Sequence, residues 1–534
     1  MTNQQADIYK KAASDPELQK IIEACDTDVA LYGKLFHPED FFLEPSSIHR
    51  KMQEHLDRTD IHKKLIVAPR GIGKTTTVKA FVTRAILYRK YRFILYISKS
   101  EGHAILQTEG IKSNLRYSKI IRTLYGDVKI SDYEGDDPTF AKKGWIAFGH
   151  TFILPRGLNQ QVRGLIWTAP SGGSFRQDLI IADDTGDDER LKNEKLRRDD
   201  REWWFAQVEE SLGELTNPNW QIIYIDTNKH PDALDNHLAE EPSWSTLRLS
   251  ICDDNYKTLA PDFRSQSWVD NKVNDARLKH RMDIFAREMQ GLPVSPETAE
   301  FKAEYFKYYT ETDGEDSLSK FTLRKKRGDL VTVVLSDPAK TQKMTNAETG
   351  FVVWSIDTRT GELFERFAEG VHVDPKGFFD RLFQLAELYE CVLIGIETNS
   401  LEEYITQPLM DEMFKRGKMY QFLDLKPRKG VEELSGLEGG KVGRGRALAL
   451  KYQQGLVWHN ANACGALEGP LLSFPRPAKW DVLDAAAYIV QVLSFGNLFS
   501  SNNGYDDNSY EMVDEESEYE GIYDEPALQL PVYY

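Results

Sequence analysis

The stretch "KLIVAPRGIGKTTT" (residues 64–77) is an apolar run followed by a glycine-containing turn and then by a helix-like segment. Its two glycines permit the tight curvature that lets successive backbone N–H groups face a phosphate. Lys74 can reach the β- and γ-phosphates of a nucleotide, and the Thr75 hydroxyl can ligate Mg²⁺. Ala68 stands where the P-loop pattern has its first glycine, but the required order of strand, loop and helix is kept. The sequence therefore predicts a P-loop that binds ATP with Mg²⁺.

A second motif of the same site follows in "DLIIADD" (178–184), where a buried strand ends in two acids. Asp183 is placed to hold the Mg²⁺ through water, and Asp184 to polarise the attacking water. The residues predicted to bind ATP are Arg70, Gly71, Ile72, Gly73, Lys74, Thr75, Thr76 and Asp183.

A third strand, "QIIYID" (221–226), is followed by Thr227 and Asn228. We expect these two residues either to sense the γ-phosphate and couple it to motion or only to cap the loop. Uninterrupted apolar strands that alternate with helix-length segments predict an α/β domain with a parallel sheet. The expected strands of this domain are 64–68, 93–98, 145–149, 179–182 and 221–226, and residues 235–320 are expected to form helices and a connector.

A second strand-rich unit begins at "DLVTVVLSD" (329–337) and has a predicted hairpin over 349–371 and a final helix over 480–495. Asp337 and Glu397 each end an apolar strand, and Asp481 and Asp484 lie one turn apart on the final helix. Carboxylates at such positions can converge on two divalent ions that cleave a phosphodiester. A ligand set rich in carboxylates favours Mg²⁺ or Mn²⁺ over zinc. Taken singly, each acid could equally be a turn residue, and Asp481 a helix N-cap.

Length and composition place the chain among ordinary globular proteins of more than one domain, at 534 residues with 41% hydrophobic and 28% charged residues. Four isolated cysteines without CxxC spacing favour a reducing cytoplasm and argue against zinc or disulfide scaffolding. The absence of a long apolar run argues against a membrane span. The net charge of −17 is uneven, because residues 505–534 carry ten Asp and Glu and no Lys or Arg. Basic clusters in the second half are compatible with a nucleic-acid partner.

The motifs "IVAPRGIGKTT", "LIIADD" and "IDTNKH" resemble those of the large terminase subunit, the DNA-packaging ATPase and nuclease of tailed bacteriophages. The resemblance covers roughly residues 35–495. It implies an N-terminal P-loop ATPase domain of the RecA/ASCE type and a C-terminal RNase H-like nuclease domain with a mixed sheet. The expected divisions are a helical, adenine-side segment (1–60), the ATPase domain with its connector (61–300), the nuclease domain (301–500) and an acidic disordered tail (501–534).

The same resemblance assigns further roles. Arg163 in "QQVRGL" matches the arginine finger, with Arg156 in "LPRGL" as the competing candidate, and "WTAPSGGSFRQ" (167–177) looks like an insertion. Asp481 is carried over as a metal ligand beside Asp337 and Glu397, and Asp484 as an accessory ligand. The basic segment 439–460 is expected to contact DNA phosphates, unless it is only a solvated loop. Its expected contact residues are Lys441, Arg444 and Arg446.

The resemblance also implies a packaging motor that drives double-stranded DNA through a portal into a procapsid and cuts concatemers at the start and end of packaging. The implied partners are double-stranded DNA, the portal and procapsid, a small terminase subunit, and further copies in a homo-oligomeric ring, by resemblance a pentamer. The implied location is the host cell cytoplasm. Two alternatives stay open: a cellular helicase–nuclease of DNA repair, which would need a second RecA-like domain, and a DNA-binding structural protein with decayed sites. The sequence leaves the packaging strategy and the host open.

Overall fold

A computed structural model provides the structure of the chain. The described residues are 16–129, 140–170, 172–215, 217–294, 299–311, 324–339, 348–398, 402–426, 440–477 and 479–494. Contacts divide the chain into Met1–Ser494 and Phe495–Tyr534. The second unit, and with it the predicted acidic tail, lies outside the described residues. No described helix is long and apolar enough to cross a membrane.

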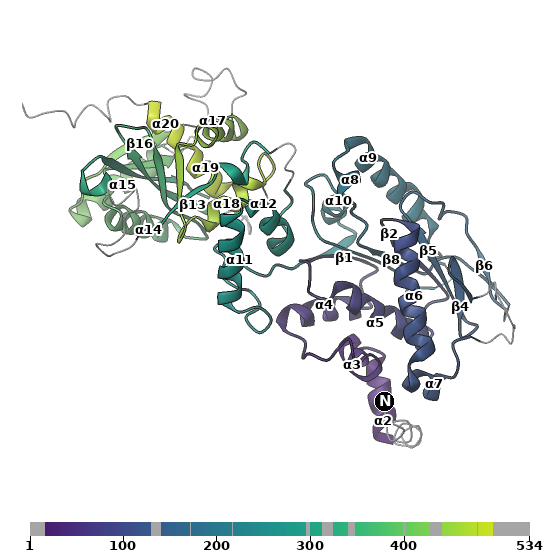
Figure 1. Cartoon of the computed structure of the whole chain (residues 1–534). Coiled ribbons are helices and arrows are strands. Elements are labelled where there is room, and N and C mark those ends of the chain that lie inside the picture. The colour runs from purple at the N-terminus through teal and green to yellow at the C-terminus, as the bar shows by residue number, and fades with distance from the viewer. Residues whose placement is uncertain are drawn as a thin grey trace, which may run out of the picture. The chain divides into compact units, whose positions relative to one another are not determined.

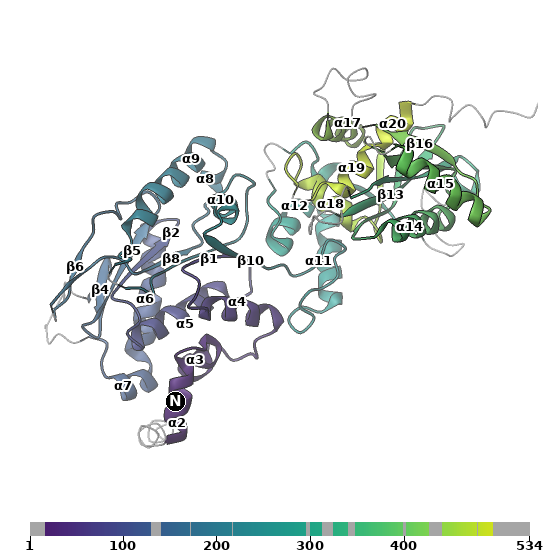
Figure 2. The ribbon, with the colours of Figure 1, turned by 180° about the vertical axis from the view of Figure 1, so that it is seen from behind.

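The first sheet has eight strands and contains the predicted P-loop strand near one edge. Its spatial order is β10 (Trp244–Arg248), β1 (Lys63–Val67), β9 (Gln221–Asp226), β8 (Leu179–Asp183), β2 (Phe93–Ser98), β5 (Thr151–Gly157), β4 (Gly144–Ala147) and β3 (Phe140–Ala141). The strands from β10 to β5 pair in parallel, and β4 and β3 add an antiparallel edge. Strand β9 lies between the P-loop strand β1 and the acidic strand β8, which is the RecA/ASCE order. Figure 2 shows β10 beside β1.

Helices cover both faces of this sheet (Figure 1). On one face lie α5 (Lys74–Leu87) and α6 (Glu101–Tyr117), and on the other α9 (Glu194–Trp203) and α10 (Leu234–Glu240). The second face is closed by large apolar side chains, among them Trp204 and Leu234. The remaining elements of this region are α2 (Pro16–Cys25), α3 (Val29–Phe36), α4 (Ser47–Asp57), α7 (Lys119–Tyr125), α8 (Asp188–Leu191), a π-helical turn (Trp204–Val208) and a 3-10 turn (Glu209–Ser211).

The connector is largely helical, as its composition predicted. It contains α11 (Gln266–Leu278), α12 (Met282–Phe285), a π-helical turn (Ala286–Gln290) and a 3-10 turn (Ala303–Tyr305). Strand β10 lies within the range expected to hold helices. Only Trp244 of its five residues is buried, so the strand has no apolar pattern that would announce it.

The second sheet has seven strands. Its order is β11 (Lys307–Tyr309), β17 (Val457–Asn460), β14 (Leu363–Val371), β13 (Thr349–Asp357), β12 (Leu330–Asp337), β15 (Leu393–Glu397) and β16 (Gln421–Leu425). Strand β13 pairs antiparallel with both β12 and β14, whereas β15 pairs in parallel with β12 and β16. Three antiparallel strands followed by two parallel ones beside the first give the RNase H-like topology. The predicted mixed sheet is confirmed.

Helices of the second sheet are α14 (Pro375–Leu388), α15 (Glu402–Arg416), α17 (Lys441–Gln453), α18 (Gly465–Leu472), α19 (Asp481–Ala487) and α20 (Ile489–Ser494). Apolar residues of α14 and α15, such as Leu382 and Leu409, pack on the sheet. Helix α19 packs against β12 and β13. The single helix expected over 480–495 is thus two short helices, α19 and α20.

Sequence patterns located most strands of the first domain but missed β5. This strand holds Pro155 and Arg156, which interrupt its apolar pattern. The stretch 167–177, which looked like an insertion, forms a small hairpin of β6 (Trp167–Thr168) and β7 (Ser174–Phe175).

Candidate ATPase and nuclease sites

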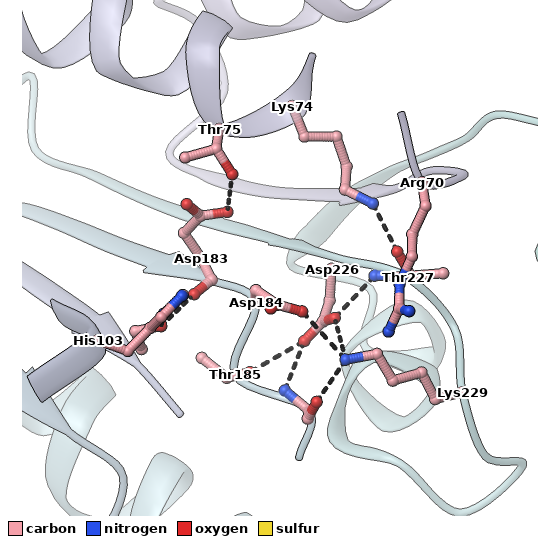
Figure 3. Close-up of polar contacts among 12 residues, drawn as sticks. Arg70, Lys74, Thr75, His103, Asp183, Asp184, Thr185, Asp226, Thr227 and Lys229 are labelled. Carbon is pink, nitrogen blue, oxygen red and sulfur yellow. Dashed lines mark hydrogen bonds and ion pairs between the residues drawn. The ribbon is translucent and has the colours of Figure 1, made fainter. Parts of the chain in front are cut away.

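The P-loop has the backbone that its glycines were expected to allow. Gly71 and Gly73 have φ of 78° and 71°, in the left-handed region that other residues adopt only with strain. Lys74 begins α5 directly after them, and its Nζ lies 2.5 Å from Thr227 Oγ1 (Figure 3). The same Nζ lies 2.6 Å from the Ala68 carbonyl. Burial lowers the pKa of Lys74. Thr227, on the loop after β9, is therefore in direct contact with the P-loop lysine.

The two residues predicted to act on Mg²⁺ lie side by side. Thr75 Oγ1 donates to Asp183 Oδ1 across 3.4 Å (Figure 3). Tyr96 donates to Oδ2 across 2.9 Å. Burial raises the pKa of Asp183 to about 6, although both hydrogen bonds act in the opposite direction. A buried carboxylate with few donors around it is suited to a cation.

Asp184 is held by a lysine that sequence reasoning did not single out. Its backbone has φ of 48°, and its Oδ1 lies 3.0 Å from Lys229 Nζ. Burial alone would raise the pKa of Asp184, but interaction with the neighbouring ammonium of Lys229 outweighs burial, and the net effect is a lowered pKa. Lys229 also lies 3.7 Å from Asp226 Oδ1 (Figure 3). Asp184 directly follows β8, and Asp226 ends the neighbouring parallel strand β9. Two acids at these positions were the signal in the sequence that a positively charged partner was required.

The other residues predicted for the ATPase site differ in their contacts and burial. Asn228 exchanges two hydrogen bonds of 3.1 Å with Asn236, which fits the loop-capping alternative. Arg70 is paired with Glu288 of the connector, with Nε 2.9 Å from Oε2. Ile72 is buried. Thr76 lies one residue into α5 beyond Thr75 and is half-buried.

The two candidate arginine fingers differ in exposure. Arg163 is exposed, and two hydrogen bonds fix the residues just before it: Gln177 donates to the Val162 carbonyl and Trp203 to the Gln160 carbonyl, each across 2.9 Å. Arg156, on β5, is half-buried, and its Nη1 donates to the Pro155 carbonyl across 3.0 Å. Of the two, Arg163 is the side chain that another subunit could reach.

In the second sheet, three of the predicted acids come together. Asp337 ends β12, Glu397 ends β15 and Asp484 lies in α19, and all three are buried. One carboxylate oxygen of each lies within 4.8 Å of the others. Burial, together with the charges of Glu397 and Asp484, raises the pKa of Asp337. Such mutual repulsion is relieved when a divalent cation binds, so these residues fit a metal site.

A glycine allows the helix to approach the sheet this closely. Gly350 is the partner of Asp337 in the β12–β13 register. A Cβ on Gly350 would lie 2.2 Å from the Asp481 carbonyl oxygen. Only a glycine therefore lets the start of α19 cross β13 and bring Asp484 to the strand ends.

The sequence assigned Asp481 as a metal ligand and Asp484 as an accessory ligand, but the structure places Asp484 with Asp337 and Glu397. Asp481 is the first residue of α19 and half-buried, and it is not in the group of three, whereas Asp484 is. The N-cap position belongs to Trp480, so Asp481 does not cap this helix. Asp481 nevertheless lies near enough to Asp337 for its charge to contribute to raising that pKa.

The basic segment predicted to contact DNA is a helix, α17, rather than a loop. Lys441 Nζ lies 2.9 Å from Asp484 Oδ2 and 3.6 Å from Asp337 Oδ2. Arg444 is 1% exposed, and its Nε lies 3.0 Å from Asp484 Oδ1. A DNA-contact role does not fit Arg444, because its guanidinium is buried against this acid. Arg446 is partly exposed and pairs with Glu300 across 3.0 Å.

No protein-family model matches the sequence, and no curated protein matches it either. Among solved structures, the chain is similar to the large terminase of a thermophilic bacteriophage in complex with ADP, at 11% identity and a TM-score of 0.28, over 85% of this chain and 100% of that one. It is also similar to the ATPase domain of the Thermus phage P74-26 large terminase, at 11% identity and a TM-score of 0.29, over 48% and 97%.

The human cytomegalovirus terminase nuclease domain is a third neighbour, at 12% identity and a TM-score of 0.24, over 36% of this chain and 91% of that one. The chain is similar to large terminases. The strand orders of the two sheets independently give the P-loop and RNase H-like folds.

Proposed function

We propose that this chain is the large subunit of a viral DNA-packaging motor, in which an ATPase moves double-stranded DNA and a metal-dependent nuclease cuts it. One observation carries the proposal. A single chain joins a P-loop sheet, with Lys74 and Asp183 at its edge, to an RNase H-like sheet whose strand ends gather Asp337, Glu397 and Asp484. A motor that both translocates and cuts DNA requires these two sites together.

In the ATPase half, the P-loop amides and Lys74 would bind the phosphates, and Thr75 and Asp183 would hold Mg²⁺ of the substrate ATP. Asp184 would orient the attacking water, and Lys229 keeps its carboxylate ionised and fixed. Thr227 contacts Lys74 directly, so a bound phosphate that broke this contact would change the position of Thr227 and of the loop after β9. That loop is the proposed route from hydrolysis to motion, and Asn228 stabilises it through Asn236.

In the nuclease half, Asp337, Glu397 and Asp484 would hold divalent ions, with Asp481 at the rim as a candidate ligand of a second ion. The ions, Mg²⁺ or Mn²⁺, would supply Lewis acidity for the attacking water and the leaving oxygen. Lys441 and Arg444 neutralise Asp484 and fix its position. Lys441, which is 43% exposed, can also reach a DNA phosphate, as can the partly exposed Arg446.

The proposed partners follow from the motor. Double-stranded DNA is the substrate, the portal of the procapsid is the channel, and a small terminase subunit selects the site at which packaging starts. The working place is the host cell cytoplasm. An arginine that acts on a neighbour's ATP requires a ring of identical subunits, and the exposed Arg163 on its fixed loop supports this role better than Arg156.

The alternative of a cellular helicase–nuclease needs a second RecA-like sheet before the nuclease. Among the described residues between Arg248 and Leu330, the structure contains helices, turns and the three-residue strand β11, which pairs with the nuclease strand β17. Those residues form no second ATPase sheet. This favours the packaging motor.

Two variants of the full-length chain test the proposal. Lys74→Ala should abolish DNA-stimulated ATP hydrolysis and leave Mn²⁺-dependent nicking of plasmid DNA at the wild-type rate. Asp337→Ala should abolish nicking and leave ATP hydrolysis. ATP turnover that persisted in Lys74→Ala would contradict the P-loop assignment, and a chain with neither activity would point to a DNA-binding structural protein.

Mixing variants tests whether the arginine acts between subunits. Arg163→Ala can still bind ATP, and Lys74→Ala still offers Arg163 to a neighbour, so the mixture should hydrolyse ATP faster than either variant alone. Arg156→Ala is the matched control and should retain its own activity. Failure of the mixture to recover, with both variants folded, would exclude Arg163 as a finger acting in trans.

A further inference from the structure

A second group of buried side chains lies in the nuclease sheet and shares no residue with the carboxylate site. Glu365 of β14, His459 of β17 and Cys464, which precedes α18, each place one potential ligand atom within 4.8 Å of the others. Glu468 of α18 joins them, with Oε1 3.5 Å from His459 Nδ1. All four side chains have 0% exposure.

Neighbouring residues bind one side of these groups and orient them. His459 Nε2 lies 2.8 Å from the Tyr452 hydroxyl. When Nε2 carries the proton and donates it to Tyr452, Nδ1 presents a lone pair to the group. Glu468 Oε2 accepts from the Tyr256 hydroxyl and from Arg277 Nη2. An oriented imidazole and an oriented carboxylate are typical of metal ligands.

On the other side of these groups, His459 Nδ1 and Glu468 Oε1 face each other across 3.5 Å, within ion-pair range but longer than a normal hydrogen bond. Among the described residues, no hydrogen bond reaches His459 Nδ1, Glu365 Oε1 or Glu468 Oε1, although all three atoms are buried. Glu365 Oε2, in contrast, accepts from the Asn460 N–H across 3.3 Å. Leaving a buried acceptor unsatisfied costs about 1–3 kcal/mol. One shared partner, such as a metal cation coordinated by all three atoms, would satisfy them at once.

We propose that Glu365, His459, Cys464 and Glu468 bind one Zn²⁺ ion. A thiolate, an imidazole and carboxylates match the ligand preference of Zn²⁺ and do not suit Mg²⁺. Arg277 Nη2 lies 3.2 Å from Cys464 Sγ. One guanidinium and one Zn²⁺ balance the charges of a thiolate and two carboxylates, so the buried site is neutral when the ion is bound.

Zn²⁺ binds the deprotonated forms of cysteine and glutamate, so any proton on Cys464 or Glu365 passes to solvent as the ion binds. The ion would tie β14, β17 and α18 to one another, and Arg277 would link α11 to them.

No sequence pattern indicates such a site, because isolated cysteines without CxxC spacing argue against zinc scaffolding. A site with one cysteine does not need that spacing. Its other ligands come from strands and a helix that only the fold brings together. The inference is independent of the packaging proposal, since it does not involve ATP or DNA.

Elemental analysis of the purified full-length chain, grown with Zn²⁺, tests the proposal. We expect about one Zn²⁺ per chain that survives gel filtration in Mg²⁺ buffer. Cys464→Ser and His459→Ala should each weaken Zn²⁺ binding by at least about tenfold. Cys391→Ser, at another buried cysteine of the same domain, should not weaken it. Asp337→Asn should retain the ion, which separates this site from the nuclease metals.

Cobalt substitution gives a readout that does not depend on the folding of a variant. Wild-type protein loaded with Co²⁺ should show a thiolate-to-cobalt charge-transfer band, which Cys464→Ser should lose while keeping the ligand-field bands. The proposal is overturned if wild-type protein holds no Zn²⁺, which would leave a bound water as the partner of these acceptors. It is also overturned if Cys464→Ser binds Zn²⁺ as tightly as wild type, or if the Co²⁺ spectrum lacks the thiolate band.

Discussion

Arg444 is buried beneath the nuclease carboxylates, with its Nε 3.0 Å from Asp484 Oδ1 and its guanidinium carbon 4.4 Å from the ring centroid of Tyr488. Tyr488 in turn donates to Glu397 Oε2 across 2.5 Å. One arginine and one tyrosine therefore position two of the three clustered acids. The arrangement makes the site depend on a basic residue that does not reach the surface.

Arg444→Met should damage both stability and cutting. Removing one partner of a buried ion pair leaves the other charge without compensation, at a cost of about 3–5 kcal/mol. We expect a lower thermal midpoint of the nuclease transition and weaker Mn²⁺ binding, measured by calorimetry. The affinity for DNA in EDTA should change little, because the guanidinium is buried.

Arg446→Met is the matched control for that experiment. Arg446 lies on the same helix and pairs with Glu300 at a partly exposed position, so its loss should cost no more than about 1 kcal/mol. If Arg444→Met instead lowered DNA affinity while leaving stability intact, Arg444 would be a DNA contact, as its sequence context first indicated.

Gly350→Ala should separate the helix from the sheet. The added Cβ would meet the main-chain oxygen of Asp481 at 2.2 Å, where no flexible side chain can give way. We expect a loss of stability of about 1–3 kcal/mol and reduced Mn²⁺ affinity, since Asp484 moves with α19. Gly102→Ala in α6 is the control, because a Cβ there meets nothing within 4 Å and should not destabilise. Wild-type Mn²⁺ binding in Gly350→Ala would contradict this account of the close approach.

Sequence patterns predicted the parts of the fold whose signal is local. The P-loop glycines, the buried strand ending at Asp183 and the strand-end acids Asp337 and Glu397 all follow from periodicity and position. The choice between Asp481 and Asp484 did not follow, because it depends on how α19 crosses β13 at Gly350. A single glycine in a strand gives no indication of which helix lies over it.

Ion pairs between residues far apart in the chain could not be predicted from the sequence either. Lys229 lies 45 residues from Asp184 in the chain, and Arg444 lies 40 residues from Asp484. Each lysine or arginine looked like a solvated charge, since nothing local distinguishes a surface cation from a buried one. Only the strand order, which brings the ends of β8 and β9 together, shows that Lys229 neutralises Asp184.

Lys229→Met should slow ATP hydrolysis without weakening ATP binding. The variant frees Asp184 from its 3.0 Å contact, so the carboxylate that would orient the attacking water loses its fixed position. We expect kcat to fall by about tenfold to a hundredfold, because small displacements of a positioning group are costly. KM should change little, since Lys74 and the P-loop are untouched. Steady-state kinetics with saturating DNA would measure both.

Lys229→Arg is expected to restore part of the lost kcat, because it returns the positive charge, whereas Lys79→Met on α5 should leave the kinetics unchanged. An unchanged kcat in Lys229→Met would show that the contact with Asp184 has no part in hydrolysis. A rise in KM with constant kcat would instead assign Lys229 to nucleotide binding.

Asp235→Asn should remove a pH-dependent loss of stability from the ATPase domain. Burial and the charge of Asp226 raise the pKa of Asp235 to about 7, against 3.8 for the ordinary group. Between these values the folded state binds a proton more tightly than the unfolded state, so wild-type stability falls as pH rises from 4 to 7. The asparagine variant should be more stable than wild type at pH 8, by up to about 4 kcal/mol, and the difference should vanish near pH 4. Calorimetry across this range measures it, with the exposed Glu54→Gln as a control that should show no such trend. A difference independent of pH would contradict a raised pKa at Asp235.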